Sequence, residues 1–176
     1  MEHRMIFAGA GGQGLMMLGK ILAQAAMDAG LNVTWYPSYG AEVRGGTAHC
    51  HVVVSEGRIF SPLVERASAL AIMNEPSLER FLPRLRQAGL LVLNTSLAEA
   101  PGASNGAIIA VPATEIANEL KDIRIANMVM LGALNAALDI VDDEFVVEAI
   151  EAFLPGRGHL AGLNREAYER GKGCAD

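Results

Sequence analysis

Aromatic residues, cysteines and basic side chains are all scarce in this chain of 176 residues, and each shortage argues against a class of function. Aromatic residues make up 5% of the sequence, with a single Trp, so a surface that stacks nucleic-acid bases is not expected. Asp and Glu outnumber Lys and Arg by 20 to 14, and the net charge of −6 argues against nucleic acid and anionic membranes as partners.

The only two cysteines are Cys50 and Cys174. Iron–sulfur clusters are typically held by four thiolates, so the chain is not expected to carry a cluster. The two cysteines also do not make a disulfide framework, which favours a reducing cytoplasm as the compartment.

Long hydrophobic runs are missing as well. Glycines and Lys20 interrupt the apolar stretch near the N-terminus, which is therefore not typical of a signal peptide. The least polar later run, 125–140, contains three polar residues and is too short to span a bilayer. Hydrophobic residues still reach 51% and charged residues 19%, which predicts one globular domain over residues 1–176.

A glycine loop stands between a short apolar run, Met5 to Ala8, and a helix-like segment, 15–29. This is the strand–loop–helix layout in which the pattern G-x-G-x-x-G has a mechanism. The glycines permit a tight turn, close approach of another group and close packing of the helix on the strand, while free N–H groups at the helix start attract phosphate. The candidate binding residues of this loop are Gly9, Gly11, Gly12, Gln13 and Gly14.

The loop lacks one part of the dinucleotide-binding pattern. An acid that binds the ribose should end the second strand, about 20 residues further on. The second predicted strand, 33–36, is followed by Pro37, and the first acid after it is Glu42. NAD is therefore disfavoured, whereas a phosphate of another ligand, a neighbouring protein, or a purely structural role for the glycines remains open.

A second glycine-bearing loop, 38–46, combines a Tyr, an acid and an Arg, which is unusual content for a passive linker. Its charged pair either forms a local surface ion pair or meets a partner chain or a ligand phosphate. The candidate binding residues of this loop are Ser38, Tyr39, Gly40, Glu42, Arg44, Gly45 and Gly46.

Short apolar runs alternate with helix-like segments along the first two thirds of the chain. The predicted strands are 5–8, 33–36, 47–54, 69–73, 90–93 and 107–111. A turn at 55–58 predicts that 47–54 forms an antiparallel hairpin with the apolar pair Ile59 and Phe60. The final third is expected to be helical. The pattern predicts a single three-layer, Rossmann-like α/β domain with a mainly parallel sheet and an antiparallel hairpin.

Ligand sites of open α/β sheets form at the carboxyl ends of strands. Gly9 and Ser38 stand at two such ends, so loops 9–14 and 38–46 are expected to meet at one edge of the sheet.

No residue set in the sequence amounts to a catalytic or metal site. His49 and His51 would share one face of their strand, but neither an acid nor a third His is near them in the sequence, so structural histidines are expected. Cys50 would point to the opposite face, which argues against a Cys–His pair.

The two loops together closely resemble the paired signature of the gamma subunit of 2-oxoacid:ferredoxin oxidoreductases. The matching residues are Gly9 to Gly14 and Ser38 to Gly46, followed by Cys50 to Ser55, Ile59, Ser61, Pro62, Asn74, Asn94, Asn127 and Leu131 to Ala133. Two positions depart from the family: Ala41 stands where proline is common, and Ser68 stands where Asp often precedes the next strand.

The resemblance implies a subunit of an enzyme that decarboxylates a 2-oxoacid, forms an acyl-CoA and passes two electrons to ferredoxin. Its partners would be alpha, beta and delta-type subunits, with ferredoxin reached only indirectly. Thiamine diphosphate and iron–sulfur clusters would sit on companion subunits, and the gamma domain has been linked to access of coenzyme A. By this resemblance Asn127 joins the candidate binding residues, and Arg44 or Lys20 would add positive charge.

The expected function is that of a required subunit without its own redox centre. A stand-alone nucleotide-binding Rossmann-like protein and a subunit of an indolepyruvate-type oxidoreductase are the alternatives. The substrate pocket would lie mainly on other chains, and a 2-oxoglutarate or branched-chain 2-oxoacid complex is favoured.

Overall fold

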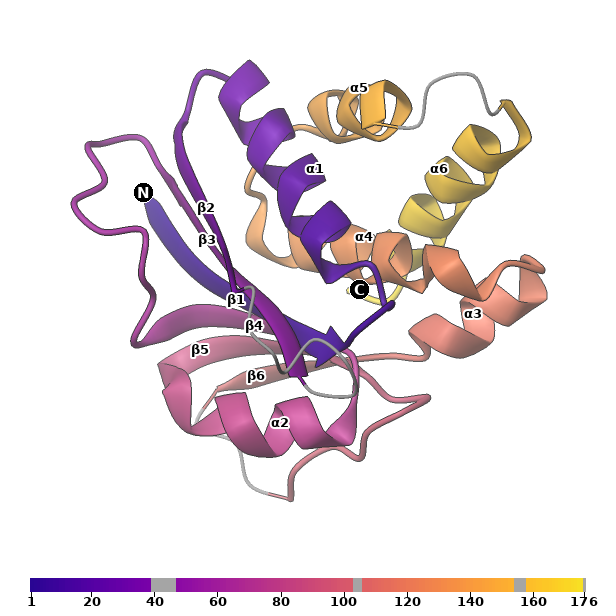
Figure 1. The fold of residues 1–176 in the computed structure, drawn as a ribbon, viewed down its shortest axis with the longest axis horizontal. Coiled ribbons are helices and arrows are strands. Elements are labelled where there is room, and N and C mark those ends of the chain that lie inside the picture. Colours follow the sequence, from indigo (N-terminus) through magenta and orange to yellow (C-terminus); the bar gives the residue numbers. More distant parts are fainter. Residues whose placement is uncertain (39–46, 103–105, 154–157, 176) are drawn as a thin grey trace.

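The computed structural model describes residues 1–38, 47–102, 106–153 and 158–175 (Figure 1). Within them a six-stranded sheet has the strand order β2-β3-β1-β4-β5-β6. The strands are β1 (Glu2–Ala10), β2 (Asn32–Ser38), β3 (Thr47–Ser55), β4 (Ala67–Ile72), β5 (Leu85–Asn94) and β6 (Ala107–Val111). Each predicted strand except Ile59 and Phe60 is present, which confirms the α/β fold.

The sheet has a parallel half and an antiparallel half. Strands β1, β4, β5 and β6 pair in parallel, whereas β3 lies antiparallel between β1 and β2. The mainly parallel sheet with antiparallel pairing is thus confirmed, but the predicted hairpin between 47–54 and Ile59-Phe60 is wrong. Phe60 is 88% exposed, and the Arg4 guanidinium binds the carbonyls of Ser61 and Leu63, so this segment is held by a side chain instead of a strand ladder.

Helices cover the two faces of the sheet unequally, as Figure 1 shows. The helices are α1 (Leu15–Asp28), α2 (Glu75–Phe81), α3 (Ala113–Glu119), α4 (Ala126–Leu138), α5 (Asp143–Phe153) and α6 (Gly158–Lys172), with the 3-10 turns η2 (Leu82–Arg84) and η3 (Ile123–Ile125). Helices α1 and α3 to α6 lie on one side, and α2 lies on the other. The helical final third is confirmed.

Alternation along β1 explains why both faces need a cover. Met5 and Phe7 point into the larger core, which contains Leu18 and Leu22 of α1. Ile6 points into the smaller core on the other face. Because successive side chains of a strand point to opposite faces, an uninterrupted apolar run marks a strand that is buried on both sides.

The helix on the smaller side of the sheet ends shortly before a proline. Helix α2 begins after Asn74, whose side chain accepts a hydrogen bond from the Ser77 N–H, and ends at Phe81. Pro83 then lies inside the 3-10 turn η2. Because proline has no N–H for an interior helical hydrogen bond, the α-helix does not continue through it. Among the helices that the structure describes, none has the length and apolarity needed to cross a membrane.

Candidate functional site

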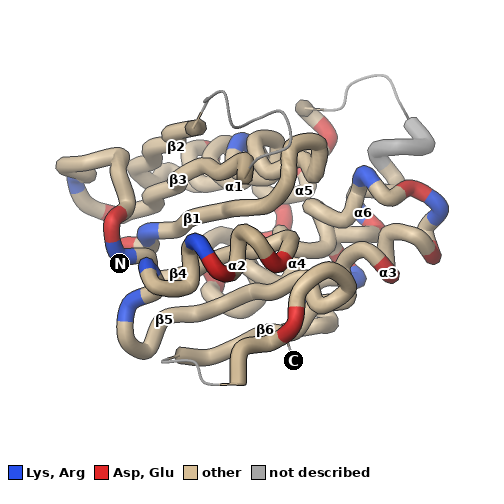
Figure 2. The backbone as a smooth tube through the Cα atoms, turned by 60° about the horizontal axis from the view of Figure 1, so that its bottom comes forward, with Lys and Arg blue, Asp and Glu red and all other residues tan. Residues whose placement is uncertain are grey.

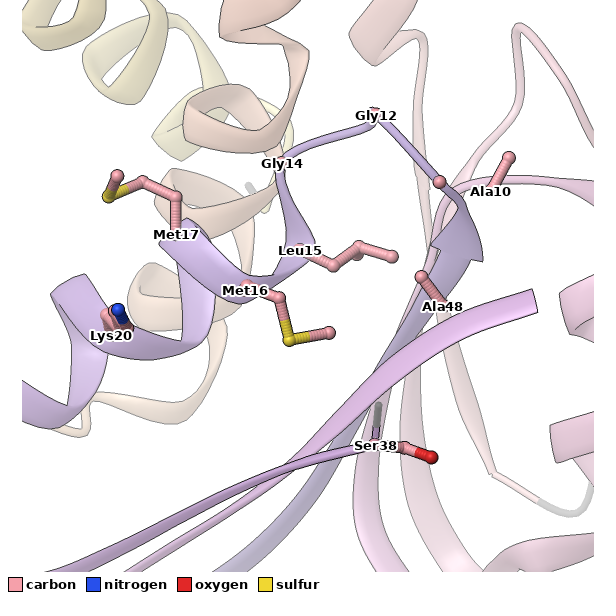
Figure 3. Close-up of a pocket in the computed structure, with 10 residues that line it drawn as sticks. Ala10, Gly12, Gly14, Leu15, Met16, Met17, Lys20, Ser38 and Ala48 are labelled. Atoms are coloured by element: carbon pink, nitrogen blue, oxygen red, sulfur yellow. The ribbon is translucent and has the colours of Figure 1, made fainter. Parts of the chain in front are cut away.

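A pocket opens where β1 passes into α1, as Figure 3 shows in close-up. Its volume is about 360 Å³. It is lined by the glycine loop, the first turns of α1 and the adjoining ends of β2 and β3: Ala10, Gly11, Gly12, Gly14, Leu15, Met16, Met17, Lys20, Ser38 and Ala48. The pocket therefore lies at the carboxyl ends of β1 and β2, the edge that the sequence predicts.

The glycine loop keeps its shape through its own backbone and one side chain. Gln13 donates its N–H to the Ala10 carbonyl at 3.3 Å, and its side-chain oxygen accepts the Ala10 N–H at 2.6 Å. A Cβ on Gly9 would lie 2.7 Å from the Cβ of Met73, so this position needs glycine for packing. The amide oxygen of Gln13, one of the predicted binding residues, is thus used inside the loop.

Gly14 and Gly12 adopt backbone conformations that other residues rarely take. Their φ angles are +76° and +92°, in the left-handed region. Gly14 also occupies the N-cap of α1, and no side chain of the described residues caps the helix there. Within the described part of the chain, no side chain therefore uses the first backbone N–H groups of α1, which are the groups that bind anions at a helix start.

The pocket has positive character despite the acidity of the whole chain. The first turn of α1 contains no acidic residue, so no carboxylate within that turn offsets the positive end of the helix dipole. Lys20 adds a cation at the pocket wall, and its ammonium lies 5.1 Å from the centre of the Trp35 ring. Met16 and Met17 make the wall between these polar groups apolar and adaptable. The arrangement can hold an anionic group joined to an apolar chain.

The second predicted loop begins and ends beside this pocket. Ser38 lines the pocket at the end of β2, and Thr47, where β3 begins, pairs with Ala10. Tyr39, Gly40, Glu42, Arg44, Gly45 and Gly46 lie outside the described residues. Ser38 is thus brought to the glycine loop as expected, and a binding role for the other residues of the loop stays a prediction.

Asn127 joins the start of α4 to the start of α1. Its side-chain N–H donates to the Gly14 carbonyl at 3.0 Å, and the residue is 5% exposed. A second hollow of about 260 Å³ lies on this side of α1 and includes Asp122, Arg124 and Asn127 in its wall. Sequence reasoning found Asn127 only through the resemblance and missed Arg124, because nothing in the sequence places η3 beside α1.

The asparagines that follow two other strands have structural partners. Asn74 caps α2, as described above. Asn94 donates to the Met73 carbonyl at 3.2 Å and to the Thr114 hydroxyl at 2.9 Å, and its oxygen accepts the Thr114 N–H. These amides tie neighbouring loops together at the carboxyl edge of the sheet.

The histidines of β3 lie on the smaller side of the sheet, away from the pocket. The His49 and Phe81 ring centres are 4.8 Å apart, and the Nδ1 of His51 accepts the Val64 N–H at 3.1 Å. Burial, together with the charge of Arg84 and with His49, lowers the pKa of His51 to about 4. Cys50 points to the opposite face, as predicted, and burial raises its pKa to about 12. His51 and Cys50 are thus packed as core residues.

Among the described residues, no group of three or more His, Cys, Asp and Glu is arranged to hold a metal ion. The sheet also differs from the order found in dinucleotide-binding proteins. There the second strand neighbours the first, whereas here β3 separates β2 from β1. The end of β2 carries Ser38 instead of the ribose-binding acid. Both features weigh against the dinucleotide interpretation.

Comparison with known proteins connects this geometry to a family. Residues 4–174 match the family described as pyruvate ferredoxin/flavodoxin oxidoreductase. The ketoisovalerate oxidoreductase subunit VorA of Methanothermobacter marburgensis is 39% identical over 171 residues, which cover 97% of this chain and 36% of the relative. The chain thus spans about a third of the length of that relative.

Solved structures with the same fold include a protein of similar length. The gamma subunit of a keto/oxoacid ferredoxin oxidoreductase from Geobacter sulfurreducens has a TM-score of 0.86 at 28% identity, with 98% of both chains covered. The 2-oxoglutarate:ferredoxin oxidoreductase from Magnetococcus marinus, solved with 2-oxoglutarate, coenzyme A and succinyl-CoA, has a TM-score of 0.90 at 25% identity; the match covers 99% of this chain and 31% of that one. This chain belongs to the pyruvate ferredoxin/flavodoxin oxidoreductase family.

Proposed function

We propose that this chain is the gamma-type component of a cytoplasmic 2-oxoacid:ferredoxin oxidoreductase, which converts a 2-oxoacid and coenzyme A to an acyl-CoA and CO₂ while reducing ferredoxin. The observation that carries the proposal is the family match over residues 4–174 in a chain with only two cysteines. Companion alpha, beta and delta-type subunits supply the thiamine diphosphate and the iron–sulfur clusters, and this chain supports their assembly.

Within the complex, we assign the glycine-loop pocket to coenzyme A. The first N–H groups of α1 and the Lys20 ammonium suit a diphosphate, and Met16 and Met17 suit the apolar parts of a pantetheine arm. The bound coenzyme A of the Magnetococcus protein supports a coenzyme A function for this fold family. The chain itself supplies no redox step.

Isolation of the native complex tests the assembly role. A tagged chain purified gently from its native host should bring down thiamine-binding and iron–sulfur chains in fixed ratio. Assayed with ferredoxin, that material should consume a 2-oxoacid only in the presence of coenzyme A. Isolation of this chain alone, with no such activity in the extract fraction, would overturn the proposal.

The substrate is tested in the same material with pyruvate, 2-oxoglutarate, 2-oxoisovalerate and indolepyruvate. We expect 2-oxoglutarate or 2-oxoisovalerate to have the highest kcat/KM, since those acids are named for the Magnetococcus and Methanothermobacter proteins. Preference for indolepyruvate would instead support the indolepyruvate-type alternative.

The coenzyme A assignment is tested with Lys20→Gln. Loss of one cation at the pocket wall should raise the KM for coenzyme A about fivefold, with little change in kcat. Arg165→Gln, which removes an equal charge from the exposed side of α6, is the matched control and should leave KM unchanged. Equal KM values for all three proteins would remove coenzyme A from this pocket. In thermal titrations of the isolated chain, a response to NAD or NADP but not to coenzyme A would favour the nucleotide-binding alternative.

A further inference from the structure

The end of the sheet opposite the glycine loop carries a concentration of arginines. Figure 2 shows basic residues at the beginnings of β1, β4 and β5, close to the N-terminus. A hollow of about 550 Å³ lies there, lined by Arg66, Leu85, Arg86 and Gln87. Eight residue steps of β1 separate this end from the glycine loop, which at about 3.3 Å per step makes the strand about 26 Å long.

The arginines of this hollow differ from the neighbouring Arg4 in their partners. Arg4 forms an ion pair with Glu2 at 2.9 Å. Arg66 donates a hydrogen bond of 3.5 Å to a neutral group, the Pro83 carbonyl. Among the described residues, neither Arg66 nor Arg86 forms an ion pair with a carboxylate. Two cationic side chains therefore line one hollow, and no carboxylate of the described residues lies within ion-pair distance of either.

The pKa of a nearby histidine is affected by one of these arginines. His3, at the start of β1, is half-buried, and its pKa is lowered by burial first and then by the positive charge of Arg86.

An irregular backbone holds Arg86 and Gln87 in place. The pairing of β4 with β5 shifts its register near the start of the two strands. Ala67 pairs with Leu85, but Ala69, only two residues later, pairs with Leu90, five residues later. The extra residues of β5 bulge out of the ladder, and Ala88 in this bulge has a φ of +58°. A non-glycine residue in the left-handed region is strained, and such strain concentrates at binding and catalytic sites. The bulge directs a donor-rich segment outward where a regular strand would have continued.

We propose that the hollow formed by Arg66, Arg86 and Gln87 binds a small oxyanion with two or more negative charges, separate from the glycine-loop pocket. Guanidinium groups match phosphoryl and carboxylate oxygens with paired hydrogen bonds, and the Gln87 amide adds a neutral donor. The hollow is within the usual size of small-molecule sites. The ligand is a small molecule with phosphoryl groups or with several carboxylates. Both kinds of group present negatively charged oxygens to the arginines.

The test uses the isolated full chain at fixed ionic strength, with inorganic pyrophosphate and citrate as separate probes. Amide NMR should show saturable shifts at residues 85–89 with at least one probe, and the tighter probe identifies the source of the oxyanion. Arg66→Gln and Arg86→Gln should each weaken binding about fivefold, and the double variant should bind more weakly than either single variant. Arg165→Gln, which makes the same change of charge on α6, should bind like the wild type.

Several results would overturn the proposal. One is the absence of saturable shifts at 85–89 with either probe. Others are shifts confined to the glycine loop, or equal weakening by Arg165→Gln, which would mark a general charge effect. A failure here leaves the coenzyme A assignment intact, because that assignment depends on Lys20 and on turnover of the assembled enzyme.

Discussion

The Asn127 side chain donates a hydrogen bond of 3.0 Å to the carbonyl of Gly14, across 113 positions of the sequence. The same carbonyl accepts the Leu18 N–H at 2.9 Å as the first bond of α1. One backbone oxygen therefore serves both the first turn of α1 and the start of α4. This contact ties the glycine loop to the helical final third of the chain.

Gly14→Ala should disturb this contact more than Gly12→Ala does. Both residues have positive φ angles, so either alanine costs about 1 kcal/mol in backbone strain. An added Cβ on Gly14 would collide with the Asn127 amide, whereas no described atom lies within 4 Å of one on Gly12. We expect Gly14→Ala to lower the free energy of unfolding by about 1–2 kcal/mol more than Gly12→Ala, measured by urea titration.

The variant Asn127→Ala separates two costs of Gly14→Ala: the collision of the added Cβ with the Asn127 amide and the backbone strain at Gly14. Alone it should cost about 1–2 kcal/mol through the lost buried hydrogen bond. In the Asn127→Ala background, Gly14→Ala should then cost about as much as Gly12→Ala. Strictly additive effects of the two changes would show that the amide and Gly14 do not interact.

Helices α4 and α6 approach each other closely at two glycines. A Cβ on Gly132 would meet the Tyr168 carbonyl, and one on Gly171 would meet the Val129 carbonyl. Because both obstacles are backbone atoms, Gly132→Ala and Gly171→Ala should each destabilise the fold by about 2–3 kcal/mol in urea unfolding. Gly162→Ala is the control on α6: no described atom lies within 4 Å, so it should be neutral or stabilise by up to about 1 kcal/mol. Similar losses in all three variants would point to something other than close packing.

A polar cluster joins α5 to α6. The Tyr168 hydroxyl donates to Asp143 at 2.6 Å, and the Lys172 ammonium binds the other oxygen of that carboxylate. Burial of Asp143 favours a higher pKa, but the hydrogen bonds from Lys172 and Tyr168 outweigh burial and lower it. The folded protein thus holds ionised Asp143 better than the unfolded chain does, so this stabilisation is present above about pH 4 and is lost as pH falls further.

Asp143→Asn tests that pH dependence. At pH 7 the variant should be less stable by about 1 kcal/mol, a modest value because the Asp143 side chain is 45% exposed and solvent screens the pair. The difference from the wild type should shrink when urea unfolding is repeated at pH 3. Glu148→Gln, at an exposed position of the same helix, should show no comparable change. A constant difference at both pH values would contradict the assignment.

The strand order shows where prediction from sequence ends. Apolar runs and glycine loops predict the strands and the edge at which Ser38 meets the glycine loop. They do not predict that 47–54 inserts between β1 and β2, because strand pairing depends on contacts between residues distant in sequence. Ile59 and Phe60 were expected to pair locally, but Arg4 holds the segment after them through backbone carbonyls.

The candidate site, too, is predicted only in part from the sequence. The G-x-G-x-x-G pattern predicts the loop and the open start of α1, because each glycine has a local steric reason. Arg124 and Met17 line its second hollow only through the packing of η3 and α4 on α1, which no local pattern encodes. The arginine hollow was missed because its residues, Arg66 and Arg86, stand 20 positions apart in polar segments.

His51 makes stability depend on pH in a second range. Its pKa is lowered to about 4 by burial, by Arg84 and by His49, whereas an unfolded chain has a His pKa of about 6.5. Between these values the unfolded state binds more protons, so stability is complete above about pH 6.5 and falls as pH drops towards 4. One pKa unit corresponds to 1.36 kcal/mol, so about 2 kcal/mol should be lost at pH 5.

His51→Gln should remove this loss. Glutamine does not titrate, and its side-chain oxygen can still accept the Val64 N–H that His51 Nδ1 accepts at 3.1 Å. In urea unfolding at pH 7.5, 6 and 5, the wild type should lose about 2 kcal/mol more than the variant over this range. His3→Gln corrects for the other histidine whose pKa is lowered, and it should keep most of the wild-type loss. If wild type and His51→Gln lose stability in parallel, the proton uptake belongs to other groups and His51 is not buried in its neutral form.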